Sequence, residues 1–477
     1  MQPSVIGFIV CIALYGATRL MGGSVLVALM ASIPFGSTAI ATLPSLGGSS
    51  PLIFTVFSVL LLATVAMRQS VVRDIGRAYG LYPTFWLVTL LMVYAVVSSV
   101  FLPRLFAGQT SAFIPTTFGV QEVALAPVSG NISQTGYFLL GGMTFAAVSL
   151  LMLRGMPLSE VRRAYFAWAF LHAAMGAIDL AGKMAGAGDI MEPIRTASYA
   201  MLTEVSHSGF WRIVGGQSEA SAFAGVGLST LCFSYVYWRR TASQLALGLT
   251  LTLLILLILS TSSTAYAGLA VLSIPVGWSI VRSLGARRLQ IAELILLGGF
   301  ALCFMALLTV MVVNPRFFDP FLNLLDATLV NKLETDSGQE RTYWNYKSLQ
   351  SVIDTGGLGI GFGSSRASSW LIAVVSQMGV TGAVLMGLLV LAMTRESRAF
   401  RLMADPETRA IVAATRAAAF GGLLSATMVG GSADPGPVFF ITLAVTTCVQ
   451  ARYAHVPAVP PATAGGAGAE VVRYRAA

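Results

Sequence analysis

Three arginines lie in polar segments that border long apolar runs, and this residue type suits the binding of an anion. Arg212 lies in Phe210-Trp-Arg-Ile-Val-Gly-Gly-Gln217, Arg341 lies in Gln339-Glu-Arg-Thr-Tyr-Trp344, and Arg366 ends a glycine-rich segment. A guanidinium keeps its charge at physiological pH and donates two parallel hydrogen bonds to a phosphate. Three such groups beside membrane-entering segments suit a diphosphate.

The position of Arg341 in its own segment also favours an anion. Ser337-Gly-Gln-Glu340 is a capping-box pattern, which predicts that a helix begins here with Arg341 in its first turn. A cation is unfavourable there, because the free N–H groups already make a helix N-terminus positive. An anion held by these N–H groups and the guanidinium explains the arrangement. The alternative is a local ion pair of Arg341 with Glu340 or Asp336.

Three residues are candidates for a general base, and the sequence alone leaves the choice open. Glu219 begins an apolar segment, where the helix dipole by itself would stabilise a carboxylate. His207 lies in a polar segment, and Glu340 directly precedes Arg341.

Aromatic residues accompany the arginines. Trp211 directly precedes Arg212, and Tyr343 and Trp344 follow Arg341 closely. Trp370, at the start of an apolar run, is better explained as an anchor at the membrane interface.

The segment Gly356-Gly357-Leu-Gly359-Ile-Gly361-Phe-Gly363-Ser-Ser-Arg366 alternates glycine with larger residues. Glycines in this pattern allow a close approach to a ligand or a sharp turn. The spacing is not GxGxxG after a strand, so a dinucleotide site is rejected. Taken alone, the segment predicts a flexible connection into the next apolar helix. No carboxylate pair with metal-ligand spacing occurs in the polar loops, so we expect neither a metal nor a cofactor.

Composition limits the class of protein that can carry these residues. The chain has 477 residues, of which 56% are hydrophobic and 10% charged, with a net charge of +9. Soluble domains carry about 25% charged residues, so this chain is expected to be embedded in lipid. Its apolar runs, such as 245–259 and 294–313, are continuous, which indicates helices rather than barrel strands. The arginine excess marks cytoplasmic loops, and no nucleic-acid partner is expected.

The apolar runs predict an all-α polytopic membrane protein with about 12–13 transmembrane helices. The thirteen predicted spans are 4–20, 22–44, 51–67, 82–101, 136–153, 164–182, 218–238, 243–260, 264–281, 290–313, 367–394, 411–429 and 435–451. Cys11, Cys232, Cys303 and Cys448 all lie in apolar runs, and we interpret them as buried hydrophobic residues.

Charge places the loops on two sides of the membrane. From the third span onward every second loop is rich in arginine, which predicts that these loops and the C-terminus are cytoplasmic. The long loops 102–135, 183–217 and 314–366 then lie outside, and a short helix is expected at 318–333. Residues 1–455 form a single transmembrane domain in this scheme, and the Pro/Ala/Gly-rich tail 456–477 is expected to be a disordered cytoplasmic segment.

Taken in order along the chain, these segments resemble the bacterial O-antigen polymerase and ligase family, which includes exopolysaccharide polymerases. The resemblance is carried by Arg212-Ile-Val-Gly-Gly216, Ser260-Thr-Ser-Ser-Thr264, Gln339-Glu-Arg-Thr-Tyr-Trp344, Gly357-Leu-Gly-Ile-Gly361 and Ser376-Gln-Met-Gly-Val-Thr-Gly382. It implies a GT-C-like, metal-independent glycosyltransferase of the bacterial inner membrane, whose active site and helical loop 314–366 face the periplasm.

The same resemblance implies the substrate and the partners. The donor would be an oligosaccharide linked to undecaprenyl diphosphate, which enters from the membrane lipid. Arg212 and Arg341 would bind its diphosphate, and Trp211, Tyr343 and Trp344 would line the groove for its sugars. Partners would be a chain-length regulator and other polysaccharide assembly proteins. The function expected is a polymerase that joins lipid-linked repeat units in exopolysaccharide or O-antigen synthesis.

Two departures from the family's pattern bear on this expectation. Ser263 occupies a position that is usually arginine in the tight turn, and Ser368 stands where the ligase branch has histidine. The second departure argues for a polymerase and against a ligase of O-antigen or another glycan. A flippase or exporter of lipid-linked oligosaccharide is the other alternative, and it would place its charges along a central cavity.

Overall fold

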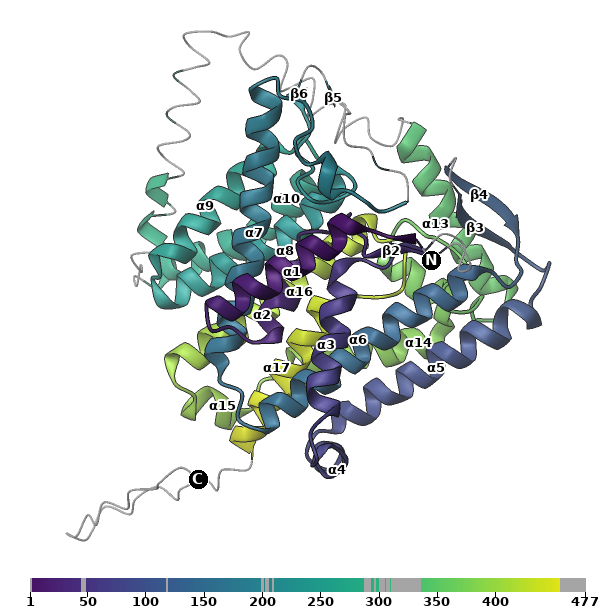
Figure 1. The fold of residues 1–477 in the computed structure, drawn as a ribbon, viewed down its shortest axis with the longest axis horizontal. Coiled ribbons are helices and arrows are strands. Elements are labelled where there is room, and N and C mark those ends of the chain that lie inside the picture. The colour runs from purple at the N-terminus through teal and green to yellow at the C-terminus, as the bar shows by residue number, and fades with distance from the viewer. Residues whose placement is uncertain are drawn as a thin grey trace.

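The structure is a computed structural model that describes residues 2–43, 49–116, 119–198, 201, 206–207, 210–286, 293–295, 297–299, 305, 309 and 336–454. Most of these residues are helical (Figure 1). The helices are α1 (Val5–Leu20), α2 (Val25–Ser32), α3 (Ile53–Ala66), α4 (Val71–Leu81), α5 (Pro83–Leu105), α6 (Ser129–Leu153), α7 (Leu158–Met184), the 3-10 helix η2 (Glu192–Ile194), α8 (Ala220–Thr241), α9 (Gln244–Leu259), α10 (Ser263–Gly285), α13 (Asp336–Asp354), α14 (Trp370–Thr394), α15 (Arg398–Met403), α16 (Pro406–Val429) and α17 (Pro437–Ala454).

Seven helical segments among the described residues are long and apolar enough to cross a membrane: α5, α6, α7, α8, α10, α14 together with α15, and α16. The pair α3 and α4 adds an eighth if it counts as one span bent by 102°. The apolar helices α1 and α9 are shorter, with 16 residues each. A chain with this many apolar helices is a polytopic helical membrane protein, as its composition predicts.

Some of the predicted spans are wrong or lie outside the described residues. The segment 22–44 contains only the eight-residue α2, because Pro34 and Gly36 follow it and the chain then passes through turns to β2 (Ala41–Thr42). The span predicted at 290–313 lies mostly outside the described residues. The expected helix at 318–333 and the tail 456–477 lie outside them entirely.

The mostly helical fold agrees with the all-α prediction, and the described residues add three short two-stranded antiparallel sheets to it. They pair β1 (Gln2–Pro3) with β2, β3 (Ser111–Thr116) with β4 (Gly119–Ala124), and β5 (Ser206–His207) with β6 (Phe210–Trp211). The β3–β4 hairpin lies against α13, where the Tyr343 hydroxyl donates to Glu122 Oε2 at 2.7 Å.

Small residues bring α8 and α16 into close contact. Gly225 of α8 lies against Ser425 of α16, and Gly421 of α16 lies against Ser229 and Leu228 of α8. Close backbone approach through small residues is the usual way for helices to associate within a membrane. Three of the four cysteines, Cys11, Cys232 and Cys448, are free and buried, as predicted, and Cys303 lies outside the described residues.

The two sets of loops lie at opposite ends of the bundle. Figure 1 shows α4 and α15 at the lower end, and β5, β6 and α13 toward the upper end. The lower end carries arginine-rich segments, such as Arg73 and Arg77 in α4 and Arg398 and Arg401 in α15. The segments that carry Arg212 and Arg341 belong to the other end.

Candidate functional site

Three arginines from distant parts of the sequence converge at the upper end of the bundle. Burial lowers the pKa of Arg212, the charge of Glu219 opposes this shift, and the charge of Arg341 adds to it. Burial also lowers the pKa of Arg366, with the same opposition from Glu219 and the same addition from Arg341. Since such interactions act over short distances, Arg212, Arg341, Arg366 and Glu219 form one cluster, which we call the arginine cluster.

The guanidinium groups of this cluster lack protein partners among the described residues. None of the three forms an ion pair with a described side chain, and Arg212 Nε is buried without a hydrogen-bond partner. The local pair of Arg341 with Glu340 is therefore not formed, while the side chain of Asp336 lies outside the described residues. Arginine stays charged near neutral pH even with a lowered pKa, so the cluster keeps positive charge available for an anion.

Arg341 and Arg366 are brought together by contacts between α13 and the loop that follows it. Arg341 is the sixth residue of α13 and so lies in the second helical turn, one turn later than expected. Asn345, four residues further and on the same helix face, accepts a hydrogen bond from Ser368 N at 2.9 Å. This contact ties the loop of Arg366 to the face of α13 that carries Arg341.

The loop of Arg366 is also held from two other sides. Arg366 N donates to Phe113 O of β3 at 2.8 Å, and Ala367 N donates to Gly431 O at 3.2 Å. The side chain of Arg366 lies directly against Gly431, close enough that a Cβ there would meet Arg366 Cγ at 2.8 Å. More than a third of Arg366 is nevertheless exposed. The residue is thus partly open to solvent, although burial around its charged group lowers the pKa of Arg366.

Close contacts with neighbouring backbone hold the glycine-rich segment before Arg366 in place, so the prediction of a flexible connection is wrong. Gly359 and Gly361 adopt φ of +83° and +95°, which only glycine tolerates without strain. A Cβ on Gly359 would lie 2.5 Å from Gly379 N, and one on Gly361 would lie 2.7 Å from Ser98 O. The glycines thus approach neighbouring backbone instead of a ligand.

This packing coincides with a break in α14. Gly379 has non-helical φ and ψ of 62° and −167° inside the helix. The carbonyls of Ser376 and Gln377, freed by the break, accept from Ile360 N at 2.9 Å and Gly361 N at 3.0 Å. A broken membrane helix needs such partners for its backbone, and the glycine-rich segment supplies them.

Of the three candidate bases, Glu219 is the one whose charge acts most strongly on Arg212 and Arg366. It forms the N-cap of α8, is partly exposed, and accepts a hydrogen bond from the Ser221 hydroxyl. Glu340 is exposed on α13, and its charge reaches Arg366 but ranks below that of Glu219. Only the backbone of His207 is described, in β5, so its imidazole lies outside the described residues.

The aromatic candidates are in part occupied with packing. The rings of Tyr343 and Trp344 both lie about 6 Å from that of Phe113 in the β3–β4 hairpin, at 6.0 and 6.1 Å. Trp211 is described only as backbone of β6. Trp370 is 5% exposed and donates from Nε1 to Ala433 O at 3.1 Å, so its predicted role as an interfacial anchor is wrong.

One group of charged residues near the cluster was not predicted. Lys183 and Arg195 pair with Asp179 at the end of α7, next to the backbone of Arg212. The sequence does contain a signal for this group, because a carboxylate in an apolar helix needs a cation and Lys183 follows Asp179 at i+4. Nothing in the sequence indicated Arg195.

A large cavity lined by described residues is separate from the arginine cluster. It measures about 1790 Å³ and is bounded mainly by apolar side chains of α8, α9, α10 and α16. Arg239, Arg240 and Arg409 also line it, whereas no residue of the arginine cluster does. A space with such walls fits lipid chains better than a glycan.

Comparisons with known protein families and with curated proteins find no match to this chain. Among the described residues, no three His, Cys, Asp or Glu side chains lie together in a way that could hold a metal ion.

Proposed function

We propose that this chain is a polysaccharide polymerase that joins oligosaccharide repeat units linked to undecaprenyl diphosphate. The observation that carries the proposal is the convergence of Arg212, Arg341 and Arg366 with no ion pair to any described side chain. A diphosphate between a lipid and a sugar carries negative charge at the membrane surface. The arginine cluster offers matching charge where the helices end.

The proposed reaction is the transfer of a glycan from its diphosphate carrier to a hydroxyl of the next repeat unit. The hydroxyl oxygen attacks the anomeric carbon, the bond from that carbon to the phosphate oxygen breaks, and undecaprenyl diphosphate leaves. Arg212 and Arg341 stabilise the charge that develops on the leaving diphosphate, and Arg366 lies beside them. Glu219 takes the proton of the attacking hydroxyl.

This function places the chain in a bacterial inner membrane with the arginine cluster on the periplasmic side. The arginine-rich segments in and around α4 and α15 would face the cytoplasm, in agreement with the charge rule for membrane proteins. The fold would be GT-C-like, and α13 would be the helical part of the periplasmic loop 314–366.

A direct test uses the purified chain in detergent with a lipid-linked repeat unit and no nucleotide sugar. We expect a ladder of longer lipid-linked products, lost in Arg341→Ala and kept in the control Arg398→Ala, at the other end of the bundle. If no ladder forms and the same lipid instead moves between the leaflets of proteoliposomes, the chain is a transporter of lipid-linked oligosaccharide. Transfer to a different acceptor without a ladder would indicate a ligase.

A further inference from the structure

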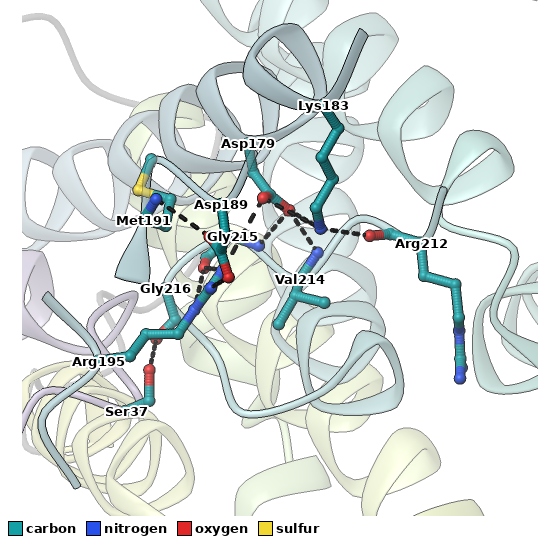
Figure 2. A network of polar contacts seen from close by, with 10 residues as sticks. All are labelled: Ser37, Asp179, Lys183, Asp189, Met191, Arg195, Arg212, Val214, Gly215 and Gly216. Atoms are coloured by element: carbon teal, nitrogen blue, oxygen red, sulfur yellow. Dashed lines mark hydrogen bonds and ion pairs between the residues drawn. The ribbon is translucent and has the colours of Figure 1, made fainter. Parts of the chain in front are cut away.

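Four charged side chains form a buried network next to the backbone of Arg212 (Figure 2). They are Asp179 and Lys183 of α7, Asp189 in the following loop, and Arg195 after η2. Lys183 Nζ lies 3.1 Å from Asp179 Oδ1, Arg195 pairs with Asp189, and Arg195 Nη2 lies 3.8 Å from Asp179 Oδ1. All four side chains are at most 8% exposed.

The network binds the backbone that carries Arg212. Asp179 Oδ2 accepts hydrogen bonds from Val214 N at 2.7 Å and from Gly215 N at 3.0 Å. Lys183 Nζ donates to the carbonyl oxygen of Arg212 at 2.7 Å. Asp179 and Lys183 therefore hold the chain on both sides of Ile213, which is itself fully buried.

Residues outside α7 also bind the carbonyl groups of Gly215 and Gly216. Arg195 Nη2 donates to Gly215 O at 2.6 Å. Ser37 donates to Gly216 O twice, from its backbone N at 3.0 Å and from its hydroxyl at 2.8 Å. Gly215 has a φ of +55°, a conformation that glycine adopts readily. The backbone from Arg212 to Gly216 is thus fixed by charged and polar side chains from three separate segments.

The side chain of Arg212 is the one part of this arrangement that the network does not use. Figure 2 shows it extending away from Asp179 and Lys183, which contact only its carbonyl side. The two carboxylates and two cations of the network balance one another, so none of them neutralises Arg212. Buried ion pairs add little net stability, so a role in fixing one conformation accounts better for this network.

We propose that Asp179 and Lys183 are positioning residues that hold Arg212 for the diphosphate of the lipid-linked donor. This inference rests on the proposed function, in which the Arg212 guanidinium binds that diphosphate. Asp179→Asn removes the charge that holds Val214, Gly215 and Lys183, so the backbone below Arg212 is released. A positioning residue acts through Arg212, and its loss has no further effect once the Arg212 guanidinium is gone.

The test measures binding of undecaprenyl diphosphate to the full chain in detergent micelles, together with thermal unfolding of each variant. Asp179→Asn and Arg212→Ala are each expected to raise Kd about 10- to 100-fold, the range for losing a hydrogen bond to a charged group. The double variant is expected to bind no more weakly than Arg212→Ala alone. A purely structural role of Asp179 would instead multiply the two effects.

Two further variants keep the test decisive. Asp74→Asn is the matched control, because Asp74 is a buried carboxylate paired with Arg154 at the opposite end of the bundle, and its Kd should equal that of the parent chain. Lys183→Gln removes the contact to the Arg212 carbonyl and the pair with Asp179, and it should raise Kd about three- to tenfold. It carries the test if Asp179→Asn fails to fold.

The possible failures are distinguishable. If Arg212→Ala weakens binding while Asp179→Asn and Lys183→Gln bind like the parent chain, the positioning role is overturned and the proposed function stands. If Arg212→Ala leaves Kd unchanged, the diphosphate assignment of Arg212 fails and the positioning role fails with it. Multiplied effects in the double variant would also overturn the positioning role.

Discussion

The packing of the glycine-rich segment predicts a large and position-specific cost for one added methyl group. In Gly359→Ala the new Cβ would lie 2.5 Å from Gly379 N and 2.9 Å from Ser376 O. Non-bonded heavy atoms are comfortable at about 3.5–4.0 Å. The two backbone segments must therefore move apart by about 1 Å, and the hydrogen bond from Ile360 N to Ser376 O at 2.9 Å stretches with them.

The size of the effect follows from two separate terms. Overpacking a tight interior costs about 1–3 kcal/mol, and the left-handed backbone costs alanine about 1–2 kcal/mol more, because Gly359 has a φ of +83°. We expect Gly359→Ala to lower the free energy of unfolding by about 2–5 kcal/mol, a large share of the 5–15 kcal/mol typical of folded proteins.

Two glycines nearby serve as matched controls. Gly356 has a φ of +58° but no atom within 4 Å of an added Cβ, so Gly356→Ala reports the backbone term alone, about 1 kcal/mol. Gly387 of α14 has open space and no left-handed φ, so Gly387→Ala should be neutral or stabilise the helix by about 0.5–1 kcal/mol.

The assay is equilibrium unfolding of the purified chain in detergent, with undecaprenyl diphosphate binding measured on each variant. Because the segment leads directly to Arg366, Gly359→Ala should weaken binding as well as stability, while Gly387→Ala should change neither by much. If Gly359→Ala were as stable as Gly356→Ala, the close contact between this segment and the break in α14 would be refuted.

Three further outcomes are expected. Arg341→Ala should raise the Kd for undecaprenyl diphosphate about 10- to 100-fold. The Kd of Arg341→Lys should lie between those of the parent chain and Arg341→Ala, because lysine keeps the charge but not the paired donors. Equal affinity of the parent chain and both variants would argue against a diphosphate contact. Glu219→Gln should lower kcat about 10²- to 10⁴-fold with little change in KM, and a parent-like kcat would remove Glu219 as the base. Burial raises the pKa of Asp434, in the α16–α17 loop, to about 6, so the folded chain holds this proton more tightly than the unfolded chain. The contribution of Asp434 to the free energy of unfolding is fully present below about pH 4 and is lost as the pH rises through 6. Asp434→Asn should therefore raise the free energy of unfolding at pH 7.5 by about 1–3 kcal/mol, toward the lower value because the residue keeps some exposure, and should flatten the pH dependence measured by thermal unfolding between pH 4 and 7; an unchanged pH profile would contradict it.

The sequence by itself determined that the chain is a helical membrane protein. Lipid offers no hydrogen bonds to a backbone, so a long apolar run has to become a helix, and the long helices α5, α6, α14 and α16 lie where such runs predict them. The sequence also singled out Arg212, Arg341 and Arg366, because unpaired cations beside apolar runs are costly unless they bind something.

Only the tertiary structure decided where helices end and what the polar residues contact. The apolar segment 22–44 does not form one membrane-spanning helix, because the backbone of its second half forms hydrogen bonds with residues distant in the sequence. Ser37 N, for example, donates to Gly216 O at 3.0 Å. The alternating glycines read the same in the sequence whether they contact a ligand or another part of the backbone. The structure shows that they pack against the backbone at the break in α14 at Gly379. The contacts of Asp179 with the backbone after Arg212, and of Lys183 with the Arg212 carbonyl, join residues up to 36 positions apart. Local sequence specifies which groups must be satisfied, whereas packing of the whole chain specifies which partners satisfy them.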